Sequence, residues 1–239
     1  MDFSKVEHIF FDLDHTLWDY DLNSKIALTR LFEVYSLQSL GIYPLEKFIS
    51  SFHKANLVVW DLFEESSLNR DQLRNKRMEL VFEDFDLDTQ VLEGFHEDYY
   101  LMCSQSPHLI HGAIELLETL NKNYSLHIIT NGFDDAQFNK LKNSGLKPYF
   151  KTVTTSEMAK SKKPEKAYFE YALNQANASP ENSLVIGDGW RTDVAGAISY
   201  GLKVIWFNQH GKPGPDPKIL QINHLPEIIT LISSFGGNL

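Results

Sequence analysis

The chain has 239 residues, and its 22 basic residues against 32 acidic ones give a formal net charge of -10. This length suits one α/β domain or a core with an inserted module, and the negative charge disfavours binding to nucleic acid polymers or anionic membranes. The single cysteine, Cys103, cannot form an intrachain disulfide, and no apolar run approaches the roughly 20 residues that a membrane-spanning helix needs. Because the amino-terminal residues also lack the basic and apolar regions of a secretion signal, we expect a cytoplasmic protein with no membrane partner.

The first predicted strand, residues 6–11, is an apolar run that ends directly before Asp12 and Asp14. Residues two positions apart on a strand share a face, so the loop that starts here can aim both carboxylates at one small volume. Two carboxylates at close range need a cation, and a divalent metal leaves one acid free as a nucleophile or proton carrier. This placement predicts phosphoryl-transfer chemistry.

A stretch of about 90 residues without a convincing strand follows, which is too long for an ordinary connection and indicates an inserted domain. Its apolar residues recur at helical spacing and predict a four-helix module, which we call the cap. The four predicted cap helices are residues 23–37, 44–63, 69–82 and 88–101. The predicted division is a catalytic core of residues 1–19 and 107–239 with a cap of residues 20–106. Because the cap leaves and rejoins the core beside the acidic loop, we expect it to cover that loop and exclude water.

After the cap, short β-rich runs alternate with helical segments. The predicted strands are residues 125–130, 152–155, 183–186 and 203–207, and the predicted helices are residues 134–144, 164–177 and 191–200. Pro164 would occupy the first turn of its helix, where proline is accepted. The alternation predicts an α/β fold with a doubly wound, Rossmann-like parallel sheet. Ligands bind at the carboxyl ends of such strands, where Asp12, Thr130 and Asp188 all fall.

A strand end at Thr130, Asn131 and Gly132 precedes a predicted helix and has the features of a phosphate-binding loop. The Thr130 hydroxyl can donate to a phosphoryl oxygen, and the N–H groups of Asn131 and Gly132 can supply further donors near a helix amino terminus. Asn-Gly is also an ordinary turn dipeptide, so the interpretation depends on the neighbouring motifs.

A basic run at residues 160–163 stands before the next helix in an otherwise acidic chain. One of its lysines, such as Lys162 or Lys163, could neutralise a transferring phosphoryl group. The competing interpretation is a solvated charge run.

A second apolar strand gives way to acids at Asp188 and Asp193. Hard oxygen ligands suit Mg²⁺, which prefers octahedral coordination with few protein carboxylates and several retained waters. We predict a magnesium site at Asp12, the Asp14 backbone carbonyl and Asp188. Asp193 would bind the metal as well, or would hold the lysine or a metal-bound water in place.

These four elements, in this order, resemble the motifs of the haloacid dehalogenase superfamily of phosphohydrolases, over essentially the whole chain. The matching segments are residues 11–17, 130–132, 163–164 and 187–193. The resemblance implies that Asp12 attacks phosphorus and forms an aspartyl phosphate, while Asp14 serves as acid and then as base. It also implies that Thr130 and Lys163 hold the phosphoryl oxygens. His15 departs from the pattern, since its position often carries Gly, Glu or Lys.

The segments 10–18 and 130–133 are similar to the pyrimidine 5′-nucleotidase subfamily, whose substrates are nucleoside monophosphates. The catalytic motifs contain no residue that would recognise a nucleobase, so specificity for the base must come from the cap or from loops near the site. Candidate stacking residues are Trp18, Trp60, Phe133 and Trp190, because base stacking on an aromatic ring contributes about 1 to 3 kcal/mol. Core packing is the competing role for each of them.

Three alternatives remain. A broad-specificity sugar-phosphate phosphatase would keep every catalytic residue and differ in its cap. A haloacid dehalogenase would use Asp12 without Mg²⁺ and typically carries tyrosine where this chain has Asp14. A noncatalytic phosphate-binding module would be expected to have lost one of the reactive groups, which are all present. The sequence does not fix the oligomeric state.

Overall fold

The computed structural model describes residues 2–87 and 94–238. The chain folds into two compact units. The core unit comprises Met1–Tyr20 and Pro107–Leu239, and the helical unit comprises Asp21–Ser106. Tyr20, which we expected in the inserted segment, groups with the core unit.

The core unit contains a parallel sheet, which confirms the predicted fold class. Its strands are β1 His8–Phe11, β2 Ser125–Ile129, β3 Phe150–Thr154, β4 Ser183–Gly187, β5 Lys203–Phe207 and β6 Gln221–Ile222. Among the described residues the order across the sheet is β3-β2-β1-β4-β5-β6, and every neighbouring pair is parallel. The short β6 was not predicted, because two residues are too few for a period-2 pattern to be recognised.

Strand β1 lies inside the sheet, with Phe11 opposite Ile128 of β2 on one side and Ile186 of β4 on the other. Helices cover both faces of a doubly wound sheet, so its central strands bury side chains on both sides and read as continuous apolar runs. Phe10 and Phe11, whose side chains point to opposite faces, are both buried. Because β1 is parallel to both β2 and β4, the loops that follow these three strands start at the same edge of the sheet.

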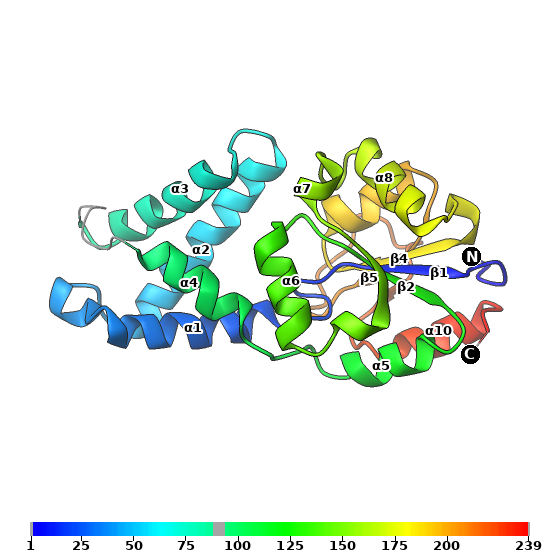
Figure 1. Ribbon diagram of the computed structural model, residues 1–239, viewed down its shortest axis with the longest axis horizontal. Coiled ribbons are helices and arrows are strands. Elements are labelled where there is room, and N and C mark those ends of the chain that lie inside the picture. Colours follow the sequence, from blue (N-terminus) through cyan, green and yellow to red (C-terminus); the bar gives the residue numbers. More distant parts are fainter. Residues whose placement is uncertain (1, 88–93, 239) are drawn as a thin grey trace. The chain divides into compact units, whose positions relative to one another are not determined.

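Helices and short helical segments connect the strands of the core unit, and the last helix follows β6. They are α5 Ala113–Leu120, α6 Asp134–Asn143, η3 Lys147–Tyr149, α7 Ser156–Ala159, α8 Lys166–Ala176, η4 Pro180–Asn182, η5 Trp190–Ala195, α9 Gly196–Ser199 and α10 Glu227–Ser234. In Figure 1, α5 and α10 lie on one side of the sheet and α8 lies on the other. The apolar faces of α8 and α9 pack with Phe10, Val185 and Val204 in one buried cluster.

The predicted cap helix 23–37 corresponds to α1, Tyr20–Val34, and two predicted helices beside the site also differ from the structure. Helix α8 begins at Lys166 rather than at Pro164, because residues 162–165 form a turn in which the Glu165 N–H donates to the Lys162 carbonyl at 2.7 Å. The predicted helix 191–200 is divided into η5, a π-helical segment, and α9. The Gly189 carbonyl accepts hydrogen bonds from the N–H groups of Asp193 and Val194, at 2.8 and 3.1 Å, and this wider turn sets the direction of the Asp193 side chain.

The helical unit contains α1, which starts in the core unit, and three further long helices. The elements are α1 Tyr20–Val34, η1 Leu37–Leu40, α2 Leu45–Glu64, α3 Arg70–Glu83 and α4 Phe95–Ser104. Helix α3 starts with a capping box between Asn69 and Gln72. Aromatic rings fill the interior, with Phe52 and Tyr99 at 4.4 Å between centroids. The predicted start of the last cap helix, Asp88, lies outside the described residues.

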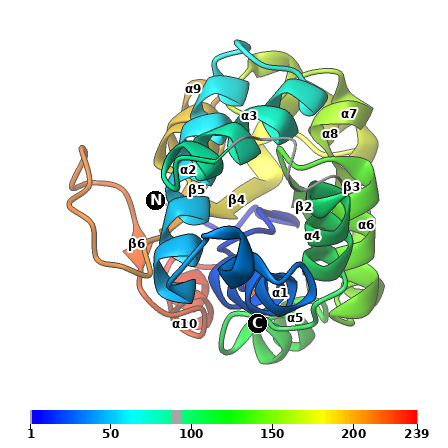
Figure 2. The same cartoon turned by 90° about the vertical axis from the view of Figure 1, so that its left-hand side faces the viewer.

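The connection between β5 and β6 is the most open part of the core unit. Residues 209–218 are exposed throughout, and Figure 2 shows this segment as an extended orange loop beside β6. It contains the run of glycine and proline residues at 211–217. Among the described residues, no helix combines the length and the apolar character that crossing a bilayer requires.

Candidate active site

A buried lysine lies between two carboxylates at the carboxyl edge of the sheet. The Lys163 ammonium donates to Asp12 Oδ1 and to Asp193 Oδ1, each at 2.6 Å, and to the Ile129 carbonyl at 3.0 Å. The Lys163 side chain is 2% exposed. Because ammonium and carboxylate groups lose their hydration when buried, these short contacts are what makes the burial tolerable.

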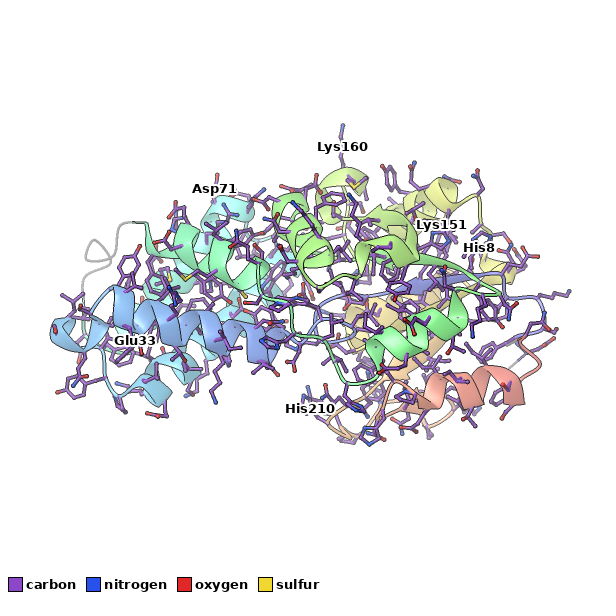
Figure 3. The ribbon with its side chains drawn as sticks, turned by 60° about the horizontal axis from the view of Figure 1, so that its bottom comes forward. His8, Glu33, Asp71, Lys151, Lys160 and His210 are labelled. Atoms are coloured by element: carbon purple, nitrogen blue, oxygen red, sulfur yellow. The ribbon has the colours of Figure 1, made fainter. Side chains whose placement is uncertain are left out.

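The main chain of Lys163 is held by the strand end that follows β2. Asn131 accepts a hydrogen bond from the Lys163 N–H at 2.8 Å and donates to the Lys163 carbonyl at 3.0 Å. In Figure 3 the labelled Lys160 side chain extends into solvent, and its residue is exposed. Lys160 therefore faces solvent, whereas the Lys163 ammonium reaches Asp12.

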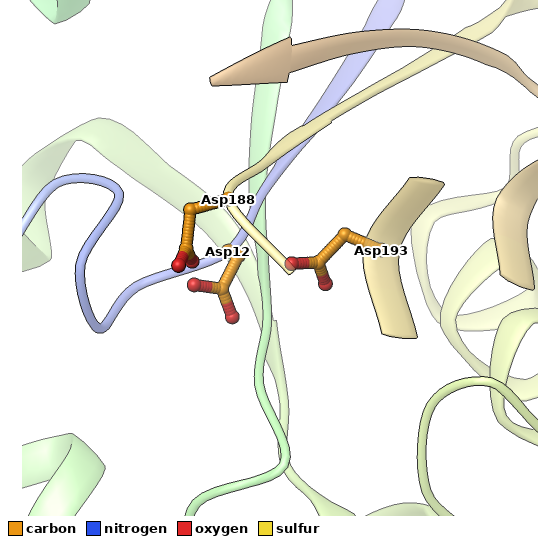
Figure 4. A group of neighbouring side chains, drawn as sticks. All are labelled: Asp12, Asp188 and Asp193. Atoms are coloured by element: carbon orange, nitrogen blue, oxygen red, sulfur yellow. The ribbon is translucent and has the colours of Figure 1, made fainter. Parts of the chain in front are cut away.

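Three carboxylates meet around this lysine. Asp12, Asp188 and Asp193 each offer an oxygen within 4.8 Å of the others, and Figure 4 shows the Asp12 side chain between the other two. Thr16, which sequence reasoning did not assign, lies between Asp12 and Asp188, with its hydroxyl 3.1 Å from Asp12 Oδ2 and 3.3 Å from Asp188 Oδ1. A hydroxyl has one hydrogen and can donate to only one of the two at a time. In the sequence, the one indication of this role was that Thr16 lies four residues after Asp12.

Burial and mutual repulsion shift the ionisation of this group. Burial raises the pKa of Asp12 to about 7, against the opposing effect of the Lys163 ammonium. Burial and the neighbouring Asp12 carboxylate raise the pKa of Asp188 well above its ordinary value. Burial alone would lower the pKa of Lys163, but Asp12 and Asp193 outweigh it and raise that pKa. Lys163 is therefore charged, and protonation of the acids competes with any cation.

The donor set fits a small divalent cation. Three carboxylates face one ammonium, which leaves a formal excess of two negative charges in a buried volume. Hard oxygen donors of this kind suit Mg²⁺. Asp193, however, accepts from Lys163 with one oxygen and from the Gly189 N–H with the other at 2.9 Å. Its engagement by these donors favours the role of orienting the lysine over that of binding the metal.

The predicted phosphate loop adjoins Lys163. The Thr130 hydroxyl accepts a hydrogen bond from the Gly132 N–H at 3.1 Å, which leaves its own hydrogen for another acceptor. The side chain of Asn131 is used to hold Lys163, so only its N–H group remains as a candidate for phosphate. Gly132 has no room for a side chain, since a Cβ there would lie 2.0 Å from Gln137 Nε2.

Asp14 accepts hydrogen bonds from two side chains of α6. Lys140 of α6 donates to both carboxylate oxygens, at 2.6 and 2.8 Å, and Gln137 donates to Oδ2 at 3.1 Å. The Asp14 side chain is 25% exposed, more than that of Asp12 at 10%. Sequence reasoning missed both α6 residues. Their spacing of three along one helix places them on a common face, which is a weak signal on its own.

The candidate stacking residues are placed in two different ways. Trp18 and Phe133 are buried at 0% and 3% exposure, which favours packing roles for both. Trp60 and Trp190 are partly exposed. Trp60 packs edge-on against Phe63 within α2, and Trp190 packs edge-on against Trp206 at 5.0 Å.

Family comparison agrees with this geometry. Residues 9–207 match the model described as haloacid dehalogenase-like hydrolase. Most of the chain is covered, so the protein belongs to this family of hydrolases. The resemblance predicted from the four motifs is confirmed.

Two curated relatives and one solved structure are similar over most of the chain. The pyrimidine 5′-nucleotidase PynA of Streptococcus pneumoniae is 32% identical over 84% of this chain and 84% of its own length. The pyrimidine 5′-nucleotidase YjjG of Escherichia coli is 33% identical over 89% of this chain and 90% of its own. The magnesium-bound structure of the HAD-hydrolase YfnB from Bacillus subtilis has a TM-score of 0.83 and 29% identity, covering 95% of this chain and 99% of that one.

Proposed function

We propose that the protein is a Mg²⁺-dependent phosphomonoester hydrolase that acts through an aspartyl phosphate, with pyrimidine nucleoside monophosphates as its substrates. The observation that carries the reaction type is the Lys163 ammonium, 2.6 Å from both Asp12 and Asp193 and next to the Thr130 loop. The substrate class rests on the similarity to PynA and YjjG.

In the first step a carboxylate oxygen of Asp12 attacks phosphorus, and the bond between phosphorus and the ester oxygen breaks. The leaving alkoxide takes a proton from Asp14. Lys163 and the Thr130 hydroxyl would stabilise the phosphoryl oxygens, whose negative charge grows during the transfer.

In the second step water attacks the phosphorus of the aspartyl phosphate, and Asp14 accepts the proton from that water. Inorganic phosphate leaves, and Asp12 regains its carboxylate. One residue thus serves as acid and then as base, and returns to its starting protonation state after each cycle.

The metal would be held by Asp12, Asp188 and the Asp14 backbone carbonyl. When bound, Mg²⁺ supplies positive charge that neutralises the carboxylates and the phosphoryl oxygens. Thr16 would support this arrangement, because its hydroxyl lies close to both Asp12 and Asp188 and accepts a hydrogen bond from the Asp188 N–H.

Mg²⁺ is expected to raise the thermal unfolding temperature, and to do so more at pH 8 than at pH 5. The pKa of Asp12 is raised from 3.8 to about 7, so without metal the folded protein loses stability as the pH rises through this window. Protons therefore compete with the cation for Asp12 less at pH 8 than at pH 5. At a Mg²⁺ concentration of about 100 Kd the stabilisation is about 2.7 kcal/mol. Thermal unfolding at both pH values, with Mg²⁺ and with chelator, measures it.

The matched variant for this measurement is Asp188→Asn, which removes one carboxylate and keeps the shape of the side chain. It should abolish most of the Mg²⁺ stabilisation. If Asp188→Asn responded to Mg²⁺ as the unaltered protein does, the metal would have to be placed elsewhere.

Replacing Asp14 with asparagine is expected to slow hydrolysis of nucleoside monophosphates about 10²-fold or more, and that of aryl phosphates much less. A nucleoside alkoxide needs a proton as it leaves, whereas an aryl oxide leaves readily without one. The rate constants for dUMP and for p-nitrophenyl phosphate, measured side by side, give the comparison. Equal losses on both substrates would contradict the assignment of Asp14 as the acid.

A panel of nucleoside monophosphates and sugar phosphates tests the substrate class. A higher kcat/KM for UMP, dUMP or dTMP than for any sugar phosphate supports the nucleotidase. The broad-specificity sugar-phosphate phosphatase is the second candidate, since it uses the same catalytic residues. Comparable turnover of sugar phosphates would favour it.

A further inference from the structure

Two side chains of α6 fix the position of Asp14. Lys140 donates to both of its carboxylate oxygens, at 2.6 and 2.8 Å, and Gln137 adds a third hydrogen bond at 3.1 Å. Asp14 comes from the loop after β1, and α6 follows the predicted phosphate loop after β2. The three hydrogen bonds therefore connect two segments that lie more than 100 residues apart in the chain.

Lys140 is a buried lysine with contacts on two sides. The residue is 6% exposed, although lysine is among the residue types that are rarely buried without a partner. Its ammonium lies 4.6 Å from the centroid of the Trp18 ring, so it contacts an aromatic ring as well as the Asp14 carboxylate. The Trp18 carbonyl accepts a hydrogen bond from the His15 N–H at 3.0 Å, which ties the backbone of Trp18 to the Asp14 loop.

Gln137 lies against the phosphate loop. It is 2% exposed and lies directly over Gly132, where a Cβ would be 2.0 Å from its Nε2 atom. A side chain at position 132 would have to displace Gln137 from the conformation in which it reaches Asp14.

We propose that Lys140 is a positioning residue for Asp14, with Gln137 as its partner, and that it affects the reaction only through the Asp14 carboxylate. The proposal rests on the proposed role of Asp14 in proton transfer. A group that transfers a proton to the leaving oxygen must lie within hydrogen-bond reach of it, and a displacement of about 1 Å can cost about 10²-fold in rate. The buried Trp18 belongs to this arrangement as the ring against which the ammonium rests.

A double-mutant cycle between positions 140 and 14 tests the proposal. Lys140→Met should lower kcat for dUMP by about 10- to 100-fold, with KM changed less than about twofold and with a smaller loss for p-nitrophenyl phosphate. In the Asp14→Asn background the same substitution should lower kcat by less than about twofold. Lys140→Arg, which keeps the charge and the hydrogen-bond donors, should recover part of the rate. Lys142→Met, at an exposed position of the same helix, is the matched control and should leave kcat unchanged.

The outcomes separate the two roles of the lysine. Equal losses in the two backgrounds would overturn the proposal, because Lys140 would then support the fold of α6 rather than Asp14. An unchanged kcat in Lys140→Met would overturn it as well. If Lys140→Met lowers the yield of folded protein, Gln137→Leu supplies the same cycle, because it removes one hydrogen bond to Asp14 and keeps a side chain over Gly132. If the unaltered protein releases phosphate from no phosphomonoester, the proposed function fails and this inference fails with it. If the protein is active but neither Lys140→Met nor Gln137→Leu changes kcat, the inference is overturned while the proposed function stands.

Discussion

Replacing Lys163 with methionine is expected to abolish phosphate release and to lower the free energy of unfolding by about 3 to 5 kcal/mol at pH 8. The substitution removes the ammonium that contacts both Asp12 and Asp193, and leaves their buried carboxylates to repel each other. Methionine has about the volume of the lysine stem, so a cavity contributes little to the loss. Urea unfolding in the presence of chelator measures the stability without interference from Mg²⁺.

The pH dependence of this loss identifies its origin. With its pKa already raised to about 7 while Lys163 is present, Asp12 is mostly protonated at pH 5 and has little charge left to compensate. The destabilisation by Lys163→Met should therefore shrink as the pH falls from 8 to 5. Lys162→Met, one position earlier, is the matched control and should retain most activity. A loss of the same size at both pH values would point to packing rather than charge, and loss of activity in Lys162→Met alone would reassign the lysine.

Asparagine in place of Asp12 is expected to reduce phosphate release by about 10³-fold or more, with the fold intact. The amide has the shape of the carboxylate but is a poor nucleophile. One of three crowded carboxylates is removed, so the unfolding temperature in chelator at pH 8 should equal or exceed that of the unaltered protein. Phosphate release from dUMP and thermal unfolding of the same preparation give both results.

A matched substitution in the exposed 209–218 segment, Asp216→Asn, controls for the general effect of removing a carboxylate. It should change neither phosphate release nor stability by a measurable amount. Substantial Mg²⁺-dependent turnover by Asp12→Asn would exclude Asp12 as the nucleophile.

Strands β1, β2, β4 and β5 were predictable because each one is an apolar run with a polar end, whereas the two-residue β6 was missed. The predicted strands 125–130, 183–186 and 203–207 differ from β2, β4 and β5 by at most one residue at either end. The helix boundaries beside the site were less predictable. Pro164 suits a first helical turn by local preference, but this segment instead forms a turn at residues 162–165 while Asn131 binds the Lys163 main chain. Tertiary hydrogen bonds decided the local structure.

The reactive groups, like the secondary structure, include some that could be predicted from the sequence and some that could not. Asp12 and Asp188 could be located because each directly follows a strand end, and sheet topology brings such ends together. Asp193 lies further on, in the π-helical segment η5, so its approach to Lys163 depends on that segment as well. Lys162 and Lys163 are both buried, and the choice between them depends on which ammonium reaches Asp12 and Asp193. The pattern of a basic run contains no such information. Lys140 was missed because an exposed helix surface is the ordinary place for a lysine. Its partner, Asp14, is distant in the sequence, and only their packing in three dimensions reveals the pair.

The position of β1 inside the sheet has a consequence for how the protein is made. The ribosome synthesises this strand before the other strands of the sheet, but its neighbour β2 begins only at Ser125 and its other neighbour β4 ends at Gly187. The nascent chain must therefore carry an apolar segment, His8–Phe11, with at least one unpaired edge until residue 187 has emerged. Non-local strand pairing of this kind is slow to form and prone to aggregation while it is incomplete. The strand that presents Asp12 is thus synthesised before the other strands, yet its second edge is paired only after most of the chain has been made.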